Sequence, residues 1–347
     1  MIHITLPAGT EPRRLPFYLS MEEWVAKNLK ADDYFFTWIV PPTVICGRNQ
    51  MMDAEINMQY CAAEGIDMCR RKSGGGAVYA DFDNVMISLI TSDTESVEAT
   101  FARFAKMLAS ALCALGISAE SSGRNDVLIG GRKVSGGAFL HLPERSIAHS
   151  TMLFSTNMQH MLRAITPAKA KLESKQVKSV ESRITTVAEH SPGLTIERLR
   201  AHIIDFCSES SIALTPQQVK EIERTEMATY GRVSRYQAHG GEVYDFKAPG
   251  KDSRHRASAY VPGAGAVSAT VTLRPDGTIA NATLGCDLLN AGDLSRIEVC
   301  LQGVPCTPEH IQAVLANIDL GSILPGVPAA TLTRILTSDD ANSGSQP

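Results

Sequence analysis

The first segment whose residue types suggest chemistry is a run of three glycines that follows basic residues. The run occupies positions 74–76, after Arg71 and Ser73, and strand-like stretches lie on either side of it. Glycine lets a backbone approach a ligand closely, with N–H groups free to face an anion, and a guanidinium offers a planar donor fork for phosphate or carboxylate. We expect a loop that binds an anionic ligand, with a tight glycine hairpin beside a solvated basic run as the alternative. It is not a Walker A loop, because no Gly-Lys-Ser or Gly-Lys-Thr follows.

A second polar segment combines an Asn-Asp pair with a lysine among small residues. Asn125 and Asp126 offer oxygen ligands of the kind that Mg²⁺ prefers, or groups that orient a phosphate. Lys133 precedes Ser135 and Gly136, so its ammonium could enter a tight pocket and hold a carboxylate and a phosphate together. Taken separately, an Arg-Asn-Asp sequence is a common turn and a lysine is usually a solvated surface group.

A third segment is basic and polar. It covers residues 169–175 and continues through 178–185. Such a stretch suits a mobile loop that closes over a nucleotide. An ordinary charged surface connection is the alternative.

Hydrophobic periodicity predicts the elements that position these segments. A helix is expected over 94–115, because Phe101, Phe104 and Leu108 recur at helical spacing and Gly116 can end it. A second helix is expected over 195–208, and the glycines at 130 and 131 predict a hairpin within 127–134. Strands are expected over residues 34–40, 67–71, 78–90 and 148–155. This part of the chain therefore mixes strands and helices.

The last third predicts a separate, smaller domain. Residues 230–252 are irregular and rich in glycine and charge, which is typical of a linker. Beyond them, Asp276 and Gly277 provide the turn of a hairpin formed by 266–274 and 278–284, and helices are expected over 291–301 and 308–318. We predict a catalytic domain over residues 1–240, a small α+β domain over 253–337 and a disordered tail over 338–347.

Composition excludes several classes of protein. The 347 residues are 44% hydrophobic and 20% charged, with a net charge of -4, which suits a soluble globular protein and gives no reason to expect a nucleic-acid partner. No apolar run is long enough to cross a membrane, and the N-terminus lacks the pattern of a secretory signal. The eight cysteines form no CxxC pair, so we expect a reduced, cytoplasmic protein. A monomer is the default expectation.

Taken in order, these segments resemble the lipoate–protein ligase A family. The resemblance rests on SGGGAVY, GRND, RKVSGGA, the AHST strand and KxKL followed by KSVxSR. PFYLSMEEW near the start is similar to the family's first helix, CGRNQ is similar to its next conserved segment, and residues 266–303 are similar to its C-terminal accessory domain. The resemblance covers nearly the whole chain, and the ordered combination is specific.

The resemblance implies a fold and a reaction. The implied fold is an α/β (α+β) catalytic domain of the biotinyl/lipoyl-transferase type, related to class II aminoacyl-tRNA synthetases, with the small α+β domain after it. The implied reaction uses ATP and Mg²⁺ to convert lipoate into lipoyl-adenylate, and then transfers the lipoyl group to a lysine of a carrier domain. The implied carriers are E2 subunits of 2-oxoacid dehydrogenases, the glycine-cleavage H protein or similar domains.

The resemblance also implies roles for individual residues. Lys133 would be the catalytic residue, because it would bridge the lipoate carboxyl group and the α-phosphate. Asp126 would ligate Mg²⁺ and Asn125 would lie near the phosphates, while the 171–183 loop would cover the adenylate. The nucleotide and lipoyl group would further contact Arg71, Ser73, Gly74, Gly75, Gly76, Ala77, Val78, Tyr79, Asn84, Ser135, Gly136, Ala138, His149 and Arg183. Val44, Val78 and Ala138 are candidates for the apolar wall of a lipoyl slot.

The chain departs from the family pattern at a few positions. Ala80 stands where a histidine usually precedes Asp81, and Ala148, His149 and Ser150 stand where the family usually has two histidines and a glycine. The loss of an imidazole at Ala80 bears on the rate or the acyl preference more than on the class of reaction.

Three other functions compete with this interpretation. An octanoyl or lipoyl transferase of the same superfamily needs no ATP, but it uses a cysteine thioester, and no cysteine lies near residues 124–126. A biotin ligase is expected to carry a Gly-Arg-Gly-Arg-like loop in place of SGGGAVY. A non-catalytic protein that binds lipoyl-adenylate without transferring it is a third alternative, motivated by Ala80.

Overall fold

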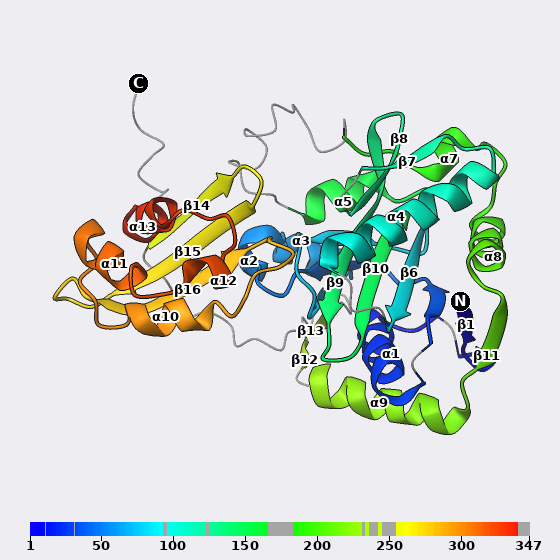
Figure 1. The fold of residues 1–347 in the computed structure, drawn as a ribbon, viewed down its shortest axis with the longest axis horizontal. Coiled ribbons are helices and arrows are strands. Elements are labelled where there is room, and N and C mark those ends of the chain that lie inside the picture. The colour runs from blue at the N-terminus through cyan, green and yellow to red at the C-terminus, as the bar shows by residue number, and fades with distance from the viewer. Residues whose placement is uncertain are drawn as a thin grey trace.

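The computed structural model describes residues 1–10, 12–30, 32–92, 96–122, 125–165, 183–230, 233–235, 242–244 and 255–338. These residues form a large α/β part and a smaller part that begins at residue 255 (Figure 1). The smaller part lies beside the large one, at the left of the view, and carries the yellow-to-red end of the chain.

An eight-stranded mixed sheet forms the centre of the large part. β1 runs parallel to β2 and to the edge strand β11, whereas the other neighbours pair antiparallel. Across the sheet the strands follow the order β11 (Ser210–Ala213), β1 (Ile2–Thr5), β2 (Tyr34–Trp38), β6 (Asn84–Thr91), β10 (Ser146–Leu153), β9 (Arg132–His141), β8 (Asp126–Ile129) and β7 (Ala119–Ser121).

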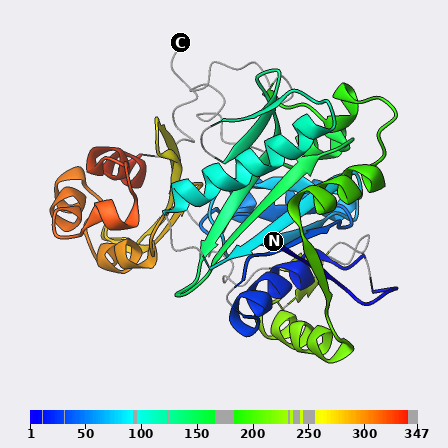
Figure 2. The ribbon, with the colours of Figure 1, turned by 45° about the vertical axis from the view of Figure 1, so that its right-hand side comes forward.

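Helices cover both faces of this sheet (Figure 2). In β6, Met86 and Ile90 belong to one buried cluster and Val85, Ile87 and Leu89 to another, because successive side chains of a strand point to opposite faces. A strand that is covered on both faces is mostly apolar, and β6 is fully buried, with five apolar residues beside Asn84, Ser88 and Thr91. The first cluster packs against α1 (Leu15–Asn28) and α9 (Pro216–Tyr230), and the second against α4 (Val97–Ala114) and α8 (Ile196–Cys207).

A second sheet, of five strands, carries the glycine run. Its order is β12-β13-β4-β3-β5, and the run connects the end of β4 to β5. The short helices α2 (Met52–Glu55), α3 (Met58–Ala63) and α5 (Met158–Ala164) contribute to its buried cluster. The strands are β3 (Thr43–Cys46), β4 (Asp67–Arg70), β5 (Val78–Ala80), β12 (Val233–Arg235) and β13 (Glu242–Tyr244).

The smaller part has its own core. A three-stranded antiparallel sheet packs against helices, with Ile297, Leu301, Ile311 and Leu332 among its fully buried side chains. Its elements are β14 (His255–Val261), β15 (Gly265–Leu273), β16 (Ile279–Cys286), α10 (Ser295–Leu301), α11 (Pro308–Leu315), α12 (Leu320–Ile323) and α13 (Ala329–Thr337).

Most of the predicted elements are confirmed. α4 and α8 occupy the two predicted helical stretches, and each begins at a side-chain cap, from Ser96 and Thr195 respectively. Gly130 and Gly131 form the turn of the β8–β9 hairpin, with φ of 57° and 74°. The turn at Asp276 and the helices α10 and α11 are also where the sequence predicts them.

Two expectations are corrected. The single strand expected over 78–90 is two strands, because Asp81 accepts a hydrogen bond from the amide of Asp83 and so forms a turn between β5 and β6. The expected linker contributes β12 and β13, which pair with each other and, through β13, with β4. β14, α9, α12 and α13 were not predicted. The basic loop up to residue 182 and the tail from 339 lie outside the described residues.

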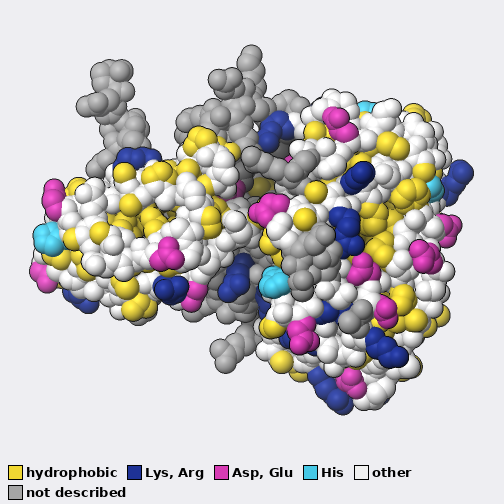
Figure 3. All heavy atoms as spheres, viewed as in Figure 1, with side chains coloured by type: hydrophobic (Ala, Val, Ile, Leu, Met, Phe, Trp, Pro, Cys, Tyr) yellow, Lys and Arg dark blue, Asp and Glu magenta, His cyan; other side chains and the backbone are white. Residues whose placement is uncertain are grey.

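The described surface shows mixed charge and no membrane-spanning element. On the face in Figure 3, basic and acidic side chains are interspersed over both parts, without one continuous basic patch among the described residues. Within the described ranges, no helix combines the length and apolar character that crossing a bilayer requires.

Packing of α4 should contribute strongly to stability. We expect Leu108→Ala to lower the free energy of unfolding by about 2–5 kcal/mol, because a buried leucine is replaced by a cavity. Lys106→Ala, at an exposed position of the same helix, should change it by less than about 0.5 kcal/mol. Urea unfolding of both variants measures the difference, and equal effects would contradict the placement of α4.

Candidate active site

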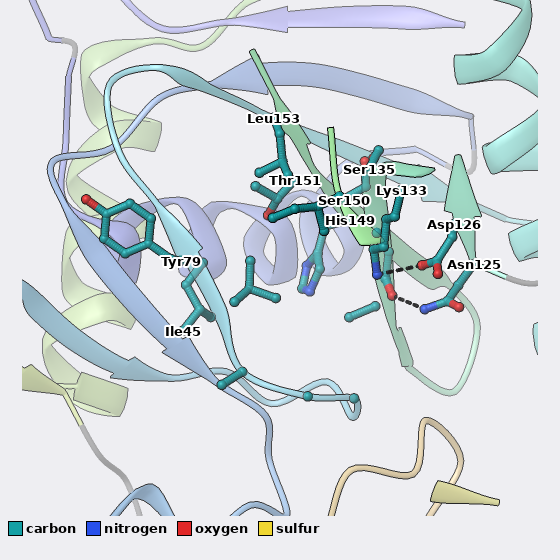
Figure 4. Close-up of a pocket in the computed structure, with 18 of the residues that line it drawn as sticks. Ile45, Tyr79, Asn125, Asp126, Lys133, Ser135, His149, Ser150, Thr151 and Leu153 are labelled. Carbon is teal, nitrogen blue, oxygen red and sulfur yellow. Dashed lines mark hydrogen bonds and ion pairs between the residues drawn. The ribbon is translucent and has the colours of Figure 1, made fainter. Parts of the chain in front are cut away.

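A cavity of about 650 Å³ opens where the glycine run, the β8–β9 hairpin, β10 and α5 meet (Figure 4). Side chains or backbone of most predicted site residues line it, although the sequence separates them widely. The predicted residues at the cavity wall are Arg71, Gly75, Gly76, Ala77, Val78, Tyr79, Asn125, Asp126, Lys133, Ser135, Gly136, Ala138, His149 and Arg183.

Three predicted residues lie behind the wall. The Ser73 hydroxyl is buried and lies 2.9 Å from Nε2 of His149. The amide of Asn84 is fully buried between the Tyr79 carbonyl and the Thr156 hydroxyl. Gly74 faces the smaller part of the molecule. Ser73, Gly74 and Asn84 therefore shape the cavity without lining it.

The guanidinium of Arg71 holds the glycine run. Its Nη2 donates to the carbonyls of Gly74 and Gly76, at 2.5 and 2.9 Å, and its Nη1 donates to the Ile45 carbonyl at 3.2 Å. Burial lowers the pKa of Arg71 to about 10, so the group still carries its charge at neutral pH. A buried cation with three carbonyl acceptors is a rigid clamp on the loop.

Two positions in this region require glycine, one because of a close backbone contact and the other because of its backbone conformation. A Cβ at Gly47 would overlap the Gly75 carbonyl, so the turn after β3 lies directly against the glycine run. Gly75 itself has φ of 89°, a conformation that favours glycine. The run therefore adopts a shape that side chains at these positions would prevent.

The smaller part of the molecule touches the same run. The Leu288 carbonyl accepts a hydrogen bond from the Gly75 amide at 3.4 Å, and a Cβ at Gly74 would lie 2.6 Å from the carbonyl oxygens of both Leu288 and Leu289. Nearby, Arg256 pairs with Asp53 at 2.7 Å. The glycine run is thus held from outside by the domain that follows it in the chain.

Lys133 projects at the polar end of the cavity and pairs with Asp126. The Nζ–Oδ1 distance is 2.7 Å, and the side chains are 40% and 29% exposed, so the pair remains accessible (Figure 4). Gly136 lies opposite Asp126 in the hairpin, and a Cβ there would overlap the end of the Lys133 side chain. The small residue therefore provides the space in which the ammonium lies.

Asn125 fixes the start of the hairpin. Its Nδ2 donates to the Gly137 carbonyl at 2.8 Å, and its own carbonyl accepts from the Gly137 amide at 2.8 Å. The backbone of Lys133 is fixed from the other side, because its carbonyl accepts from the Thr185 amide at 2.9 Å. These bonds set the positions of Asp126 and Lys133 relative to the cavity.

The sequence did not predict most of the apolar wall. Of the expected residues, Val78 and Ala138 line the cavity, whereas Val44 is buried in the cluster beneath the second sheet. Trp38 has the aromatic character of a core strand residue, and the four-residue spacing of Leu15 and Leu19 is that of a core-facing helix, so neither pattern distinguishes pocket from core. The apolar lining that was missed comprises Leu15, Leu19, Trp38, Ile45, Met86, Leu128, Val134, Leu153, Met161, Leu162, Ile165 and Ile184.

In the described part of the chain, the metal-ligating side chains at the cavity are too few to hold a metal ion unless a bound substrate supplies further ligands. The described residues contain no group of three or more histidine, cysteine or carboxylate side chains that could hold one. Two carboxylates of the described chain, Asp126 and Glu55, line the cavity, and Asp126 pairs with Lys133. Mg²⁺ is commonly bound by one or two carboxylates together with substrate phosphates, so the residues present fit a metal that arrives with a nucleotide.

Two families match successive parts of the chain. The lipoyl protein ligase A/B catalytic domain matches residues 15–208, and the bacterial lipoate protein ligase C-terminus matches residues 252–336. Lipoate–protein ligase 1 of Staphylococcus aureus is 31% identical over 92% of this chain and 95% of its own length. Lipoate-protein ligase LplJ of Bacillus subtilis is also 31% identical, over 87% and 90% of the two chains.

Solved structures share the fold. LipL1 of P. falciparum in complex with lipoate superposes with a TM-score of 0.66 at 18% identity, over 92% of this chain and 94% of that one. A bi-partite lipoate protein ligase from Thermoplasma acidophilum, studied with its E2 lipoyl domain, gives 0.58 at 21% identity over 69% and 95%. A lipoate-protein ligase A bound with ATP gives 0.56 at 18% identity over 69% and 97%.

The contact between Gly47 and the glycine run predicts a stability effect. We expect Gly47→Ala to lower the free energy of unfolding by about 1–3 kcal/mol, because the obstacle is the Gly75 backbone, which cannot rotate away. Gly321→Ala is the matched control, since its nearest neighbour would lie at an ordinary 3.6 Å. If chemical denaturation shows no difference between the two variants, the turn does not pack against the run.

Proposed function

This chain belongs to the lipoate–protein ligase family and is an enzyme of that kind, and we propose that its cavity activates lipoate with ATP. In the proposed reaction a lipoate carboxylate oxygen attacks the α-phosphorus of ATP, the bond to pyrophosphate breaks, and lipoyl-adenylate forms. The amine of a carrier lysine then attacks the lipoyl carbonyl carbon, loses its proton, and AMP leaves.

One observation carries the proposal: a cavity that is largely apolar ends at the accessible ammonium of Lys133. An apolar chain with a terminal carboxylate fits such a space, with the chain among residues such as Trp38 and Met86 and the carboxylate near Lys133. Arg71 also lines the cavity, but its Nη1 and Nη2 donate to three backbone carbonyls and its guanidinium is buried. Arg183 is a further cation at the wall, and we assign Lys133 to the reacting groups because its accessible ammonium lies beside Asp126 at the polar end.

Charge is the main requirement of the first step. Both reactants are anionic, so a positive group fixed between the carboxylate and the α-phosphate favours the transition state over the separated reactants. Asp126 Oδ1 lies 2.7 Å from the Lys133 ammonium. We propose that the substrate anions replace or share this partner when they bind.

We propose that Asp126 also ligates Mg²⁺, together with phosphate oxygens of the nucleotide. The ion would neutralise phosphate charge when bound. Within the described chain, Asp126 lies beside Asn125, whose amide is already bound to Gly137 and so keeps the carboxylate in place. The glycine run offers backbone at the same wall for the nucleotide.

The main alternative, an ATP-independent transferase, lacks its nucleophile in the described structure. No cysteine is among the described residues that line the cavity. Cys46 and Cys69 are buried in strands of the second sheet, and burial raises the pKa of Cys61 to about 12, which disfavours a thiolate there. These placements support the ligase over the thioester route.

The substrates outside this chain are also proposals. We propose a lipoyl carrier domain as the acceptor, which is supported by the archaeal relative described with its E2 lipoyl domain. We propose a catalytic domain over residues 1–240, an accessory domain over 253–337, and a monomer. A cytoplasmic location suits eight free cysteines.

Lys133 should be essential for adenylation. We expect Lys133→Gln to reduce lipoate-dependent ATP–pyrophosphate exchange by at least about 100-fold, about 2.7 kcal/mol of activation free energy, because the charge at the phosphate is lost. Arg132→Gln is the control, since Arg132 is adjacent, pairs with Glu189 at 3.2 Å and does not line the cavity. Lys133→Gln activity within about tenfold of wild type would show that another group supplies the charge.

The choice of acid tests the cavity itself. We expect ATP–pyrophosphate exchange with lipoate, weaker exchange with octanoate and none with biotin. Octanoate lacks the dithiolane ring and buries less apolar area, and the polar ureido ring of biotin would lose its hydrogen bonds to water at an apolar wall. The assay contains no carrier protein, so it isolates the first step. Absence of exchange with every acid would instead indicate a carrier-to-carrier transferase or a non-catalytic protein.

A further inference from the structure

A chain of buried hydrogen bonds runs behind the cavity wall and ends at the glycine run. Trp38 Nε1 donates to Ser88 Oγ at 2.8 Å, and Ser88 donates to Glu22 Oε1 at 2.6 Å. Glu22 Oε2 lies 2.9 Å from His149 Nδ1, and His149 Nε2 lies 2.9 Å from Ser73 Oγ. We call these five residues the Glu22 relay.

The relay is almost completely shielded from water. Glu22, Ser73 and Ser88 are each at most 2% exposed, and His149 is 8% exposed. Buried polar groups are costly unless they are paired, and a fully paired network is rigid. Its members come from α1, β2, β6, β10 and the segment before the glycines, so the relay joins parts that are far apart in sequence.

The chemistry of the first donor fixes the direction of the first two bonds. An indole N–H can only donate, so the Ser88 oxygen accepts from Trp38 and its proton goes to Glu22. The Glu22 carboxylate then accepts from His149 Nδ1 as well. In the neutral imidazole this leaves Nε2 as the acceptor, and we assign the Ser73 hydroxyl as its donor.

This assignment leaves His149 with no ring nitrogen free for substrate. Both nitrogens bond to groups behind the wall, although the side chain lies at the cavity (Figure 4). Ser73 does not line the cavity at all. The relay therefore affects the cavity through the backbone of the glycine run, which directly follows Ser73.

We propose that Glu22 is a positioning residue for the adenylation reaction: through His149 it holds Ser73 and thereby fixes the glycine run at the cavity. The run is then held on two sides, by Arg71 at the carbonyls of Gly74 and Gly76 and by the relay at the Ser73 side chain. The effect of Glu22 on adenylation rests on the proposed function, whereas the tethering of Ser73 by the relay does not depend on it.

The tether can be measured without any activity. Hydrogen–deuterium exchange of the peptide covering residues 71–79 should be faster in Glu22→Ala and in Ser73→Ala than in wild type. Ser73→Ala leaves the Glu22–His149 pair intact, so it keeps the test valid if Glu22→Ala does not fold. Ser20→Ala is the matched control, because Ser20 is 1% exposed on the same helix and, within the described structure, its hydroxyl has no hydrogen-bond partner.

The conservative variant Glu22→Gln separates hydrogen bonding from charge. The glutamine oxygen can accept from Ser88 and its amide can donate to His149 Nδ1, with the opposite tautomer of the ring donating to Ser73. We expect slow exchange of the 71–79 peptide in Glu22→Gln, as in wild type. Loss of protection in Glu22→Gln equal to that in Glu22→Ala would overturn the positional account in favour of a purely electrostatic one.

Kinetics then distinguish positioning from contact with the lipoyl chain. We expect Glu22→Ala to lower kcat of lipoate-dependent ATP–pyrophosphate exchange at least about tenfold, with a smaller change in KM for lipoate. A rise in KM for lipoate with kcat unchanged, or an unchanged 71–79 peptide, would refute the relay. If wild type shows no exchange with any acid, the proposed function fails while the deuterium measurement still tests the tether.

Discussion

The buried guanidinium of Arg71 is the interaction on which the shape of the site depends. A run of glycines has no side chains with which to pack, so its conformation must be imposed by neighbours. Arg71 imposes it by binding carbonyls at both ends of the run and one carbonyl of β3. These hydrogen bonds offset part of the free-energy cost of burying the charged guanidinium, and they fix the position of the run beside the cavity.

Each neighbour of the glycine run constrains a different part of it. Gly47 allows the turn after β3 to lie against the Gly75 carbonyl, and the Leu288 carbonyl reaches the Gly75 amide from the smaller domain. The C-terminal domain is therefore in contact with the glycine run, even though its core is separate. A change in that domain at Leu288 or Leu289 has a direct physical route to the cavity.

The site separates an apolar wall from a small polar end. The apolar wall favours binding by removing apolar ligand surface from water, which requires only that side chains such as Trp38 and Leu19 face the cavity. The polar end requires geometry, so the hairpin holds Asp126 and Lys133 through backbone bonds, and Gly136 leaves room for the ammonium. The polar atoms of Trp38 and His149 form hydrogen bonds behind the wall, so these two side chains present only their apolar surface to the cavity.

The sequence by itself determined the polar chemistry and the regular elements. The polar site segments stand out in the sequence as a glycine run, an Asn-Asp pair and a lysine among small residues. Hydrophobic periodicity predicts α4, and the turn glycines predict the β8–β9 hairpin. The tertiary structure decided which apolar residues form the wall, because Trp38 and Val44 have the same sequence character as core residues and only the fold places one at a cavity and the other beneath a sheet. It also placed Ser73 and Asn84 behind the wall and brought Glu22 to His149, since contacts between residues so distant in the chain depend on how α1 and β10 pack.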